Sequence, residues 1–322
     1  MPLFYIFFYR CFKAFLPLLA LVSLAGFSQQ DILQNFVQTD GPEKLNRLEE
    51  WCYKDLYSYE PVRKKALLDA FEQMALKKND KVSLASIVFY RGLYVTAIDG
   101  QQDQKGVALM EKAIAMAGKN GQPLQVAYFK HSLGYYYFTH VKKPVEALQN
   151  MLQAHYVFEE IGYNKLYNAA GMLDRLGYVY YHLSNFNEAV KYFKLSLKNP
   201  MENPRRHIGI LNSLGLSFRE LVEVDSAKKY FKESRHQAVL AKDTAWIGIN
   251  SGDIGRQYLS EKAYAKAKPF MEEYYNCSVT VKNTELIVEA LTGLADISLN
   301  FGKVDQALQQ LQEAEDLLEE AI

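Results

Sequence analysis

The sequence predicts an all-α protein, an α-solenoid built from stacked antiparallel helix pairs. The first observation is that small residues recur in two columns, in steps of 38 to 43 residues within each column. The second is that both columns lie in segments with apolar residues at three- and four-residue spacing, which is typical of helices packed on one face. Such a period indicates an array of one repeated unit. The columns are Gly92, Gly134, Gly177, Gly215, Gly255 and Ala295, and Gly106, Ala147, Ala189, Ala227, Ala267 and Ala307.

The clearest copy of the repeat spans residues 173–200. Large apolar residues surround two small ones, and a proline stands where the second helix must end. In order these are Leu173, Leu176, Gly177, Tyr180, Ala189, Phe193 and Pro200. The spacing resembles that of the tetratricopeptide repeat, with a leucine at the first position in place of the usual tryptophan. That repeat is about 34 residues long, so the longer period here resembles a long-repeat form with about one extra turn per helix. The resemblance implies a right-handed superhelix with a concave binding face.

Turn and cap residues support the same register. Asn185 to Asn187 predict the turn of the clearest copy, with Asn187 as the expected cap of its second helix. Later first helices are expected to begin after the pairs Asn203-Pro204, Asp243-Thr244 and Asn283-Thr284, because Asn and Asp accept hydrogen bonds from the first free N–H groups of a helix.

We expect residues 29–80 to form a diverged helical hairpin and residues 81–322 to form six repeats. Within the first segment, apolar spacing predicts helices over 44–57 and 62–77. We expect this hairpin to cover the first interface of the array. The end of the chain, 313–322, finishes the sixth repeat without a polar capping helix. Its outer interface is therefore expected to be covered by another chain or by the continuation of a longer sequence.

Residues 1–28 have the pattern of a secretory signal peptide. Arg10 and Lys13 precede an apolar run over 14–27, shorter than the about 20 residues that a membrane-spanning helix needs. Gly26 and Ser28 are small enough to permit cleavage after the run. An uncleaved N-terminal anchor is the alternative. Either reading predicts an extracytoplasmic location, periplasmic or secreted in the first case and membrane-anchored in the second.

Composition and motifs restrict the classes of function. The chain has 37 Lys and Arg against 37 Asp and Glu, so its charge balance does not suggest a nucleic-acid-binding protein, which is expected to have a basic face. Cys11, Cys52 and Cys277 are far apart and have no paired spacing, which argues against a disulfide framework and a zinc site. No phosphate loop, dinucleotide fingerprint, zinc-protease motif or nucleophile elbow is present. We therefore expect no enzymatic activity, no cofactor and no metal.

The resemblance to tetratricopeptide repeats also implies where a partner would bind. In family members that bind peptides, side chains of the first helix of each pair line the concave face. Transferred to this sequence, these positions are His131, Tyr135, Phe138, Asp174, Tyr178, Tyr181, His182, Asn212, Arg219 and Arg256. Tyrosine and arginine are favoured at binding hot spots. The alternative is that the aromatic residues among them pack within the array.

These features predict an extracytoplasmic scaffold that binds a protein or peptide and catalyses no reaction. Direct nucleic-acid binding is not expected, and any membrane attachment would run through residues 1–28. The alternative is a sensor ectodomain, or a fragment, of a bacterial membrane histidine kinase or DNA-binding transcriptional regulator, because many signal-bearing long-repeat arrays resemble the input domains of such proteins.

Overall fold

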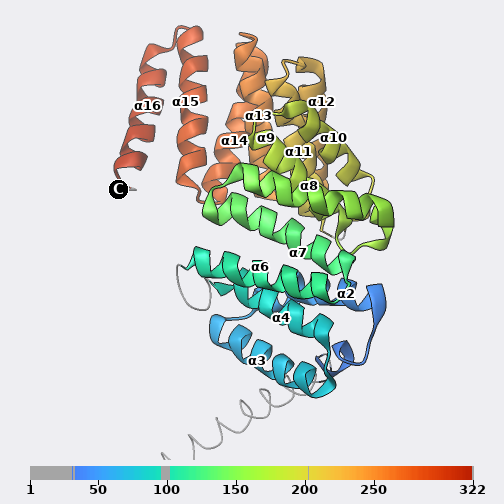
Figure 1. Ribbon diagram of the computed structural model, residues 1–322. Coiled ribbons are helices and arrows are strands. Elements are labelled where there is room, and N and C mark those ends of the chain that lie inside the picture. Colours follow the sequence, from blue (N-terminus) through green and yellow to red (C-terminus); the bar gives the residue numbers. More distant parts are fainter. Residues whose placement is uncertain (1–30, 32, 96–101, 202, 321–322) are drawn as a thin grey trace, which may run out of the picture. The chain divides into compact units, whose positions relative to one another are not determined.

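Helix follows helix along the chain in this computed structural model (Figure 1). The structure describes residues 31, 33–95, 102–201 and 203–320, and none of these lies in a β-strand. The predicted signal peptide or anchor, residues 1–28, lies outside the described residues. In the part that the structure describes, no helix combines the length and the apolar character needed to cross a bilayer.

Two compact units divide the chain, residues 1–167 and residues 168–322. The helices of the first unit, including the π-helices η1 and η2 and the 3-10 helix η3, are α2 (Gly41–Glu50), η1 (Trp51–Leu56), α3 (Pro61–Lys78), α4 (Lys81–Leu93), α6 (Asp103–Lys119), α7 (Pro123–Tyr136), η2 (Tyr137–Val141), α8 (Pro144–Ile161) and η3 (Tyr163–Lys165). Those of the second unit are α9 (Ala169–His182), α10 (Phe186–Leu197), α11 (Pro204–Glu220), α12 (Val224–Leu240), α13 (Thr244–Ser260), α14 (Tyr264–Thr280), α15 (Thr284–Asn300) and α16 (Val304–Glu319).

Consecutive helices pair in the predicted register. In the first unit, α4 packs against α6 and α7 against α8. In the second unit the pairs are α9 with α10, α11 with α12, α13 with α14, and α15 with α16 (Figure 1). Within each unit, the second helix of a pair also packs on the first helix of the next pair. The prediction of an all-α solenoid is therefore confirmed.

The small residues lie where paired helices cross. A Cβ atom on Gly215 would stand 2.5 Å from the ring of Phe231, and one on Gly177 would stand 2.8 Å from the ring of Phe193. Gly134 faces Met151 and Gly255 faces Met271 in the same way. Since these partners are buried, the absence of a side chain at the crossing lets the two backbones approach closely.

Turns of the second unit end their helices with one repeated hydrogen-bond pattern. At the end of α11, the N–H of Val222 donates to Arg219 O at 3.0 Å and the N–H of Glu223 donates to Phe218 O at 2.9 Å. This is the Schellman arrangement, in which a left-handed residue follows the helix and satisfies its last carbonyl groups. From the end of α11 onward the left-handed residues stand at intervals of 20, and they are Val222, Lys242, Lys262, Lys282 and Gly302.

Most predicted caps are confirmed, and one is wrong. The side chains of Asn203, Asp243 and Asn283 each accept a hydrogen bond from a backbone N–H in the first turn of the following helix. Asn187, however, lies inside α10, and the cap is Asn185, whose Oδ1 accepts from Glu188 N at 3.4 Å. The helix begins two residues earlier than the sequence suggested because Phe186 is already helical.

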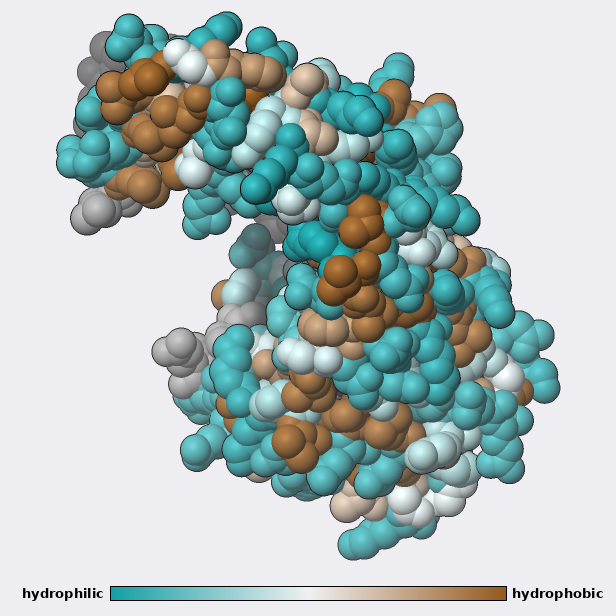
Figure 2. All heavy atoms as spheres, turned by 90° about the horizontal axis from the view of Figure 1, so that it is seen from above, coloured by the Kyte–Doolittle hydropathy of each residue, from teal (hydrophilic) through white to brown (hydrophobic). Residues whose placement is uncertain are grey.

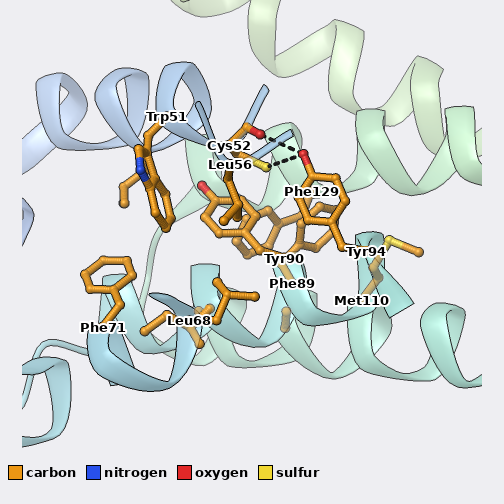
Figure 3. Close-up of a cluster of buried hydrophobic side chains, with 14 of the residues drawn as sticks. Trp51, Cys52, Leu56, Leu68, Phe71, Phe89, Tyr90, Tyr94, Met110 and Phe129 are labelled. Carbon is orange, nitrogen blue, oxygen red and sulfur yellow. Dashed lines mark hydrogen bonds between the residues drawn. The ribbon is translucent and has the colours of Figure 1, made fainter. Parts of the chain in front are cut away.

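The N-terminal helices belong to the core of the first unit. Trp51 packs edge-on against Phe71, with ring centroids 5.8 Å apart, and against Tyr90 at 6.2 Å (Figure 3). Phe89 stacks on Phe129 of the next pair at 4.2 Å. The segment before the first recognisable repeat thus joins α3 and α4 through buried aromatic rings, each burying a large apolar area.

The crossings predict a contrast between two glycines of α11. Gly215→Ala places a methyl group into the ring of Phe231, so we expect it to lower the free energy of unfolding by about 1–3 kcal/mol despite the better helix propensity of alanine. At Gly209 the nearest atom to a new Cβ is 3.4 Å away, an ordinary contact. Gly209→Ala should therefore be neutral or stabilising by up to about 1 kcal/mol. Urea unfolding followed by circular dichroism measures both, and equal effects would contradict the packing argument.

Candidate functional site

A buried carboxylate joins the first helices of two successive pairs in the second unit, α11 and α13. Asp253 of α13 is 2% exposed. It accepts hydrogen bonds from Asn212 Nδ2 at 2.7 Å, from Arg219 Nη1 at 3.3 Å and from Arg256 Nη2 at 2.8 Å. Asn212 and Arg219 come from α11, while Arg256 stands one turn after Asp253. A charge in this position is stable only because cations and donors surround it.

The network continues from Arg256 to α14 and α15. Arg256 forms a second ion pair, to Glu289 of α15, and its guanidinium lies 5.6 Å from the ring centre of Tyr274. The hydroxyl of Tyr274 donates to Glu289 at 2.6 Å. Burial by itself disfavours the charge of Arg256, but the carboxylates of Asp253 and Glu289 outweigh it and raise the pKa of the guanidinium. Arg256 is therefore a fixed cation whose side chain is held from several sides.

An aromatic group on α9 adjoins this network. Tyr178 is exposed, and its ring centroid lies 4.4 Å from that of His182 in an edge-to-face arrangement. Tyr181 packs against the ring of Phe186 at 5.4 Å. Burial and the charge of Glu220 raise the pKa of Tyr181, while Arg219 opposes this shift. The hydroxyl of Tyr181 thus lies near the charged groups that end α11.

Together these side chains make one face, defined as the α9–α13 face: Tyr178, Tyr181, His182, Arg219, Asp253 and Arg256. The first helices that carry them are neighbours, since α9 contacts α11 and the side chains of α11 donate hydrogen bonds to Asp253 of α13. Arg219 and Arg256 each keep about a third of their side-chain surface open to solvent, 33% and 31%. The face can therefore present aromatic edges and oriented N–H donors to a ligand.

Comparisons with solved structures find the same fold. The apo form of RapI is similar over 85% of this chain and 76% of its own, with 17% sequence identity and a TM-score of 0.69. A Rap protein complexed with Competence and Sporulation Factor matches over 87% of this chain and 78% of its own, with 17% identity and a TM-score of 0.55. The signal transduction ATPase PH0952 from Pyrococcus horikoshii, which has a tetratricopeptide repeat sensor, matches over 87% and 44%, with 15% identity and a TM-score of 0.62.

The fold is of the tetratricopeptide-repeat type. At identities this low, the likeness concerns the fold alone. No family model and no curated protein matches the sequence.

Within this tetratricopeptide-type fold, the ten residues predicted from the sequence fall in both units. His131, Tyr135 and Phe138 belong to the first unit, and the other seven to the second. His131 is buried in α7, with its ring 6.1 Å from that of Phe158. Tyr135 and Phe138 are half-buried. His131 thus takes part in packing within the first unit.

The seven residues of the second unit differ in exposure and contact. Asn212 is buried and donates a hydrogen bond to Asp253, whereas Tyr178 and His182 are exposed. Asp174 is partly buried on α9, and the charges of Arg206 and Arg175 act on it. The structure brings Asn212, Arg219 and Arg256 together, and it places Tyr181 close enough to feel the charge of Arg219.

Asp253, which organises the face, and Glu289, which extends it, are not among the residues predicted from the sequence. One signal was available for Asp253. It is the single charged residue between Asp243 and Arg256, in a stretch whose other residues are apolar, small or amide. A carboxylate in such a helix must find a cation on a neighbouring element. Glu289 carries no comparable signal, because it is exposed on a polar helix face.

Removal of the Asp253 carboxylate should destabilise the second unit strongly. Asp253→Ala leaves two guanidinium groups and the Asn212 amide without their shared acceptor, so we expect a loss of about 3–5 kcal/mol in the free energy of unfolding. Glu289→Gln, which neutralises a half-exposed partner of Arg256, should lose no more than about 1 kcal/mol. Chemical denaturation of both variants measures the difference, and similar small losses would show that Asp253 does not organise the face.

Asp174 predicts a pH dependence of stability. Burial raises the pKa of Asp174 to about 6 from its ordinary value of 3.8, against the opposing charges of Arg206 and Arg175. Because the folded state then holds this proton more tightly than the unfolded state, the contribution of Asp174 to stability falls as pH rises from about 4 to about 6.

The variant Asp174→Asn removes that titration, so its stability should exceed that of the parent by about 1–3 kcal/mol at pH 7 and approach it near pH 4. Thermal unfolding at a series of pH values measures the change. Parallel profiles of parent and variant from pH 4 to 7 would contradict it.

Proposed function

We propose that this chain is a non-enzymatic scaffold that binds a protein or peptide on the α9–α13 face. One observation carries the proposal: Asp253 holds Arg219 and Arg256 in place while leaving part of each guanidinium open to solvent. Donors held in advance lose little side-chain entropy when a ligand binds. Tyr181 near Arg219, and Tyr178 on the same helix, supply contact area with a polar end.

The charges of the face favour a neutral ligand. Two guanidinium groups stand among three carboxylates, of Glu220, Asp253 and Glu289. A polyanion would meet these carboxylates, whereas the carbonyl oxygens of a peptide backbone can accept from the arginine N–H groups without adding charge. An extended or helical segment with an aromatic or aliphatic anchor is the ligand that fits best.

Two further elements belong to the same proposal. The protein functions outside the cytoplasm, periplasmic, secreted or anchored through residues 1–28, because an apolar run follows Arg10 and Lys13 near the start of the chain. The structure of a Rap protein with a similar fold was solved in complex with Competence and Sporulation Factor, and this likeness supports the proposal that the present chain binds a partner. Catalysis has no part in the proposal.

Selection from a displayed library of random dodecapeptides tests the proposal and does not require the partner to be identified first. Peptides enriched on the chain are synthesised, and their dissociation constants are measured by calorimetry. We expect Tyr178→Ala and Arg219→Ala each to weaken binding by about tenfold or more, equivalent to about 1.4 kcal/mol. The matched control is Tyr156→Ala, which removes another exposed tyrosine, on α8 in the other unit.

Three outcomes would overturn the proposal. They are the absence of any enriched peptide, equal binding to all variants, or loss of binding with Tyr156→Ala alone. Circular dichroism of each variant separates a loss of contact from a loss of fold.

A further inference from the structure

The last helix of the second unit carries an exposed apolar stripe. The stripe begins at Val304 and continues four, seven and fourteen residues later, at Leu308, Leu311 and Leu318. Residues with this spacing lie on one side of an α-helix. All four are exposed. They are defined here as the α16 stripe. Figure 2 shows brown, apolar surface gathered at the side of the molecule where α15 and α16 lie.

The equivalent surface one repeat earlier is covered by a helix. Met271 follows the small residue Ala267 of α14 by four residues. Leu311 follows the equivalent residue Ala307 of α16 by the same distance, so Met271 and Leu311 occupy equivalent positions in successive repeats. Met271 is 1% exposed because it lies between Gly255 of its partner α13 and Gly293 of the following helix α15. Leu311 is 42% exposed. Leu311 of the α16 stripe thus stands at a position that a following helix covers on α14.

Within the second unit this coverage is regular. α10 is packed by α11, α12 by α13 and α14 by α15. The buried residues of α16, Ala307 and Ala314, face its own partner α15. The α16 stripe lies beside these two alanines on the helix surface, and among the described residues no helix buries it. An apolar stripe of this length is a typical groove-facing surface for a helical ligand.

The charge around the stripe defines the chemistry of the ligand. From Val304 to Glu320 the chain has six acidic residues and no lysine or arginine. Glu315 falls within the stripe, and helical geometry places Asp305, Asp316 and Glu319 along the edge that points away from α15. Two copies of α16 meeting face to face would bring like charges together. A helix with basic flanks would pair with them.

We propose that the α16 stripe is a docking site for a basic amphipathic helix of another polypeptide. The helix lies along α16 as α15 lies along α14, with its apolar side on Leu308 and Leu311 and its lysine or arginine side chains on the acidic edge. This site is separate from the α9–α13 face, so the failure of one proposal leaves the other standing.

The probe for this site can be designed from α15 itself, which already fits the equivalent surface. A labelled peptide of residues 284–300 carries the changes Glu285→Lys, Glu289→Lys and Asp296→Lys, and the matched control peptide keeps the native acidic residues. Fluorescence anisotropy with the 322-residue chain measures both. We expect micromolar binding of the basic peptide, at least about tenfold weaker binding of the acidic one, and weakening of the basic peptide as salt is raised.

Variants of the chain locate the bound peptide. Leu308→Lys and Glu315→Lys each place a positive charge on the stripe and should weaken the basic peptide at least about fivefold. Gln306→Lys adds the same charge as Leu308→Lys, but on the opposite, exposed side of α16, and should change binding less than about twofold. All three positions are exposed, so the fold tolerates the changes.

Equal binding of the two peptides would overturn the proposal, as would equal effects of the three lysine variants. Sedimentation of the chain alone supplies a further test. Self-association that Leu308→Lys abolishes would show that the stripe binds a second copy instead of a basic helix.

Discussion

The close approach of two helix backbones at each crossing is the constraint on which the rest of this structure depends. Gly177 and Gly215 leave room for the rings of Phe193 and Phe231, and the rings in turn fill the space that would otherwise separate the helices. Dense packing of this kind fixes both the distance and the angle of a pair. Once each pair is fixed, its outer sides can form regular contacts with the pairs before and after it.

Regular packing of the pairs explains how a charge can be buried in the second unit. Asp253 lies on the side of α13 that faces α11, where Asn212 and Arg219 reach it from one helix and Arg256 from its own. Such a cluster requires helix axes that do not slide, because a shift of one turn would separate the donors from the carboxylate. The polar face proposed for ligand binding is therefore a consequence of the apolar crossings behind it.

Sequence reasoning recovered those parts of the structure that depend on spacing along the chain. The columns of Gly134, Gly177, Gly215 and Gly255 predicted the crossings, since a small residue at a constant interval is typical of helices that touch at one repeated point. Caps such as Asn203 were also predictable, because the cap interacts with its own helix. The misplaced cap at Asn187 arose because two asparagines flank the turn and only the position of Phe186 decides between them.

The site depended on contacts between helices far apart in sequence, and these could be predicted only in part. The family pattern named Arg219 and Arg256 but not Asp253, since that pattern describes positions on one helix and not the partner that a charge needs. His131 occupied a patterned position and is buried against Phe158. A ring at such a position can face inward or outward, and the packing of the neighbouring helix decides which.

The regular spacing of the helix ends in the second unit affects which insertions and deletions an array of this type can accept. The helices from α11 to α15 all have 17 residues, and the same left-handed ending recurs every 20 residues from Val222 to Gly302. Each 40-residue segment therefore has the same backbone length and the same kind of turn as its neighbour. Duplication or deletion of one whole segment would preserve every junction, whereas gain or loss of a few residues would break the alignment of all that follow.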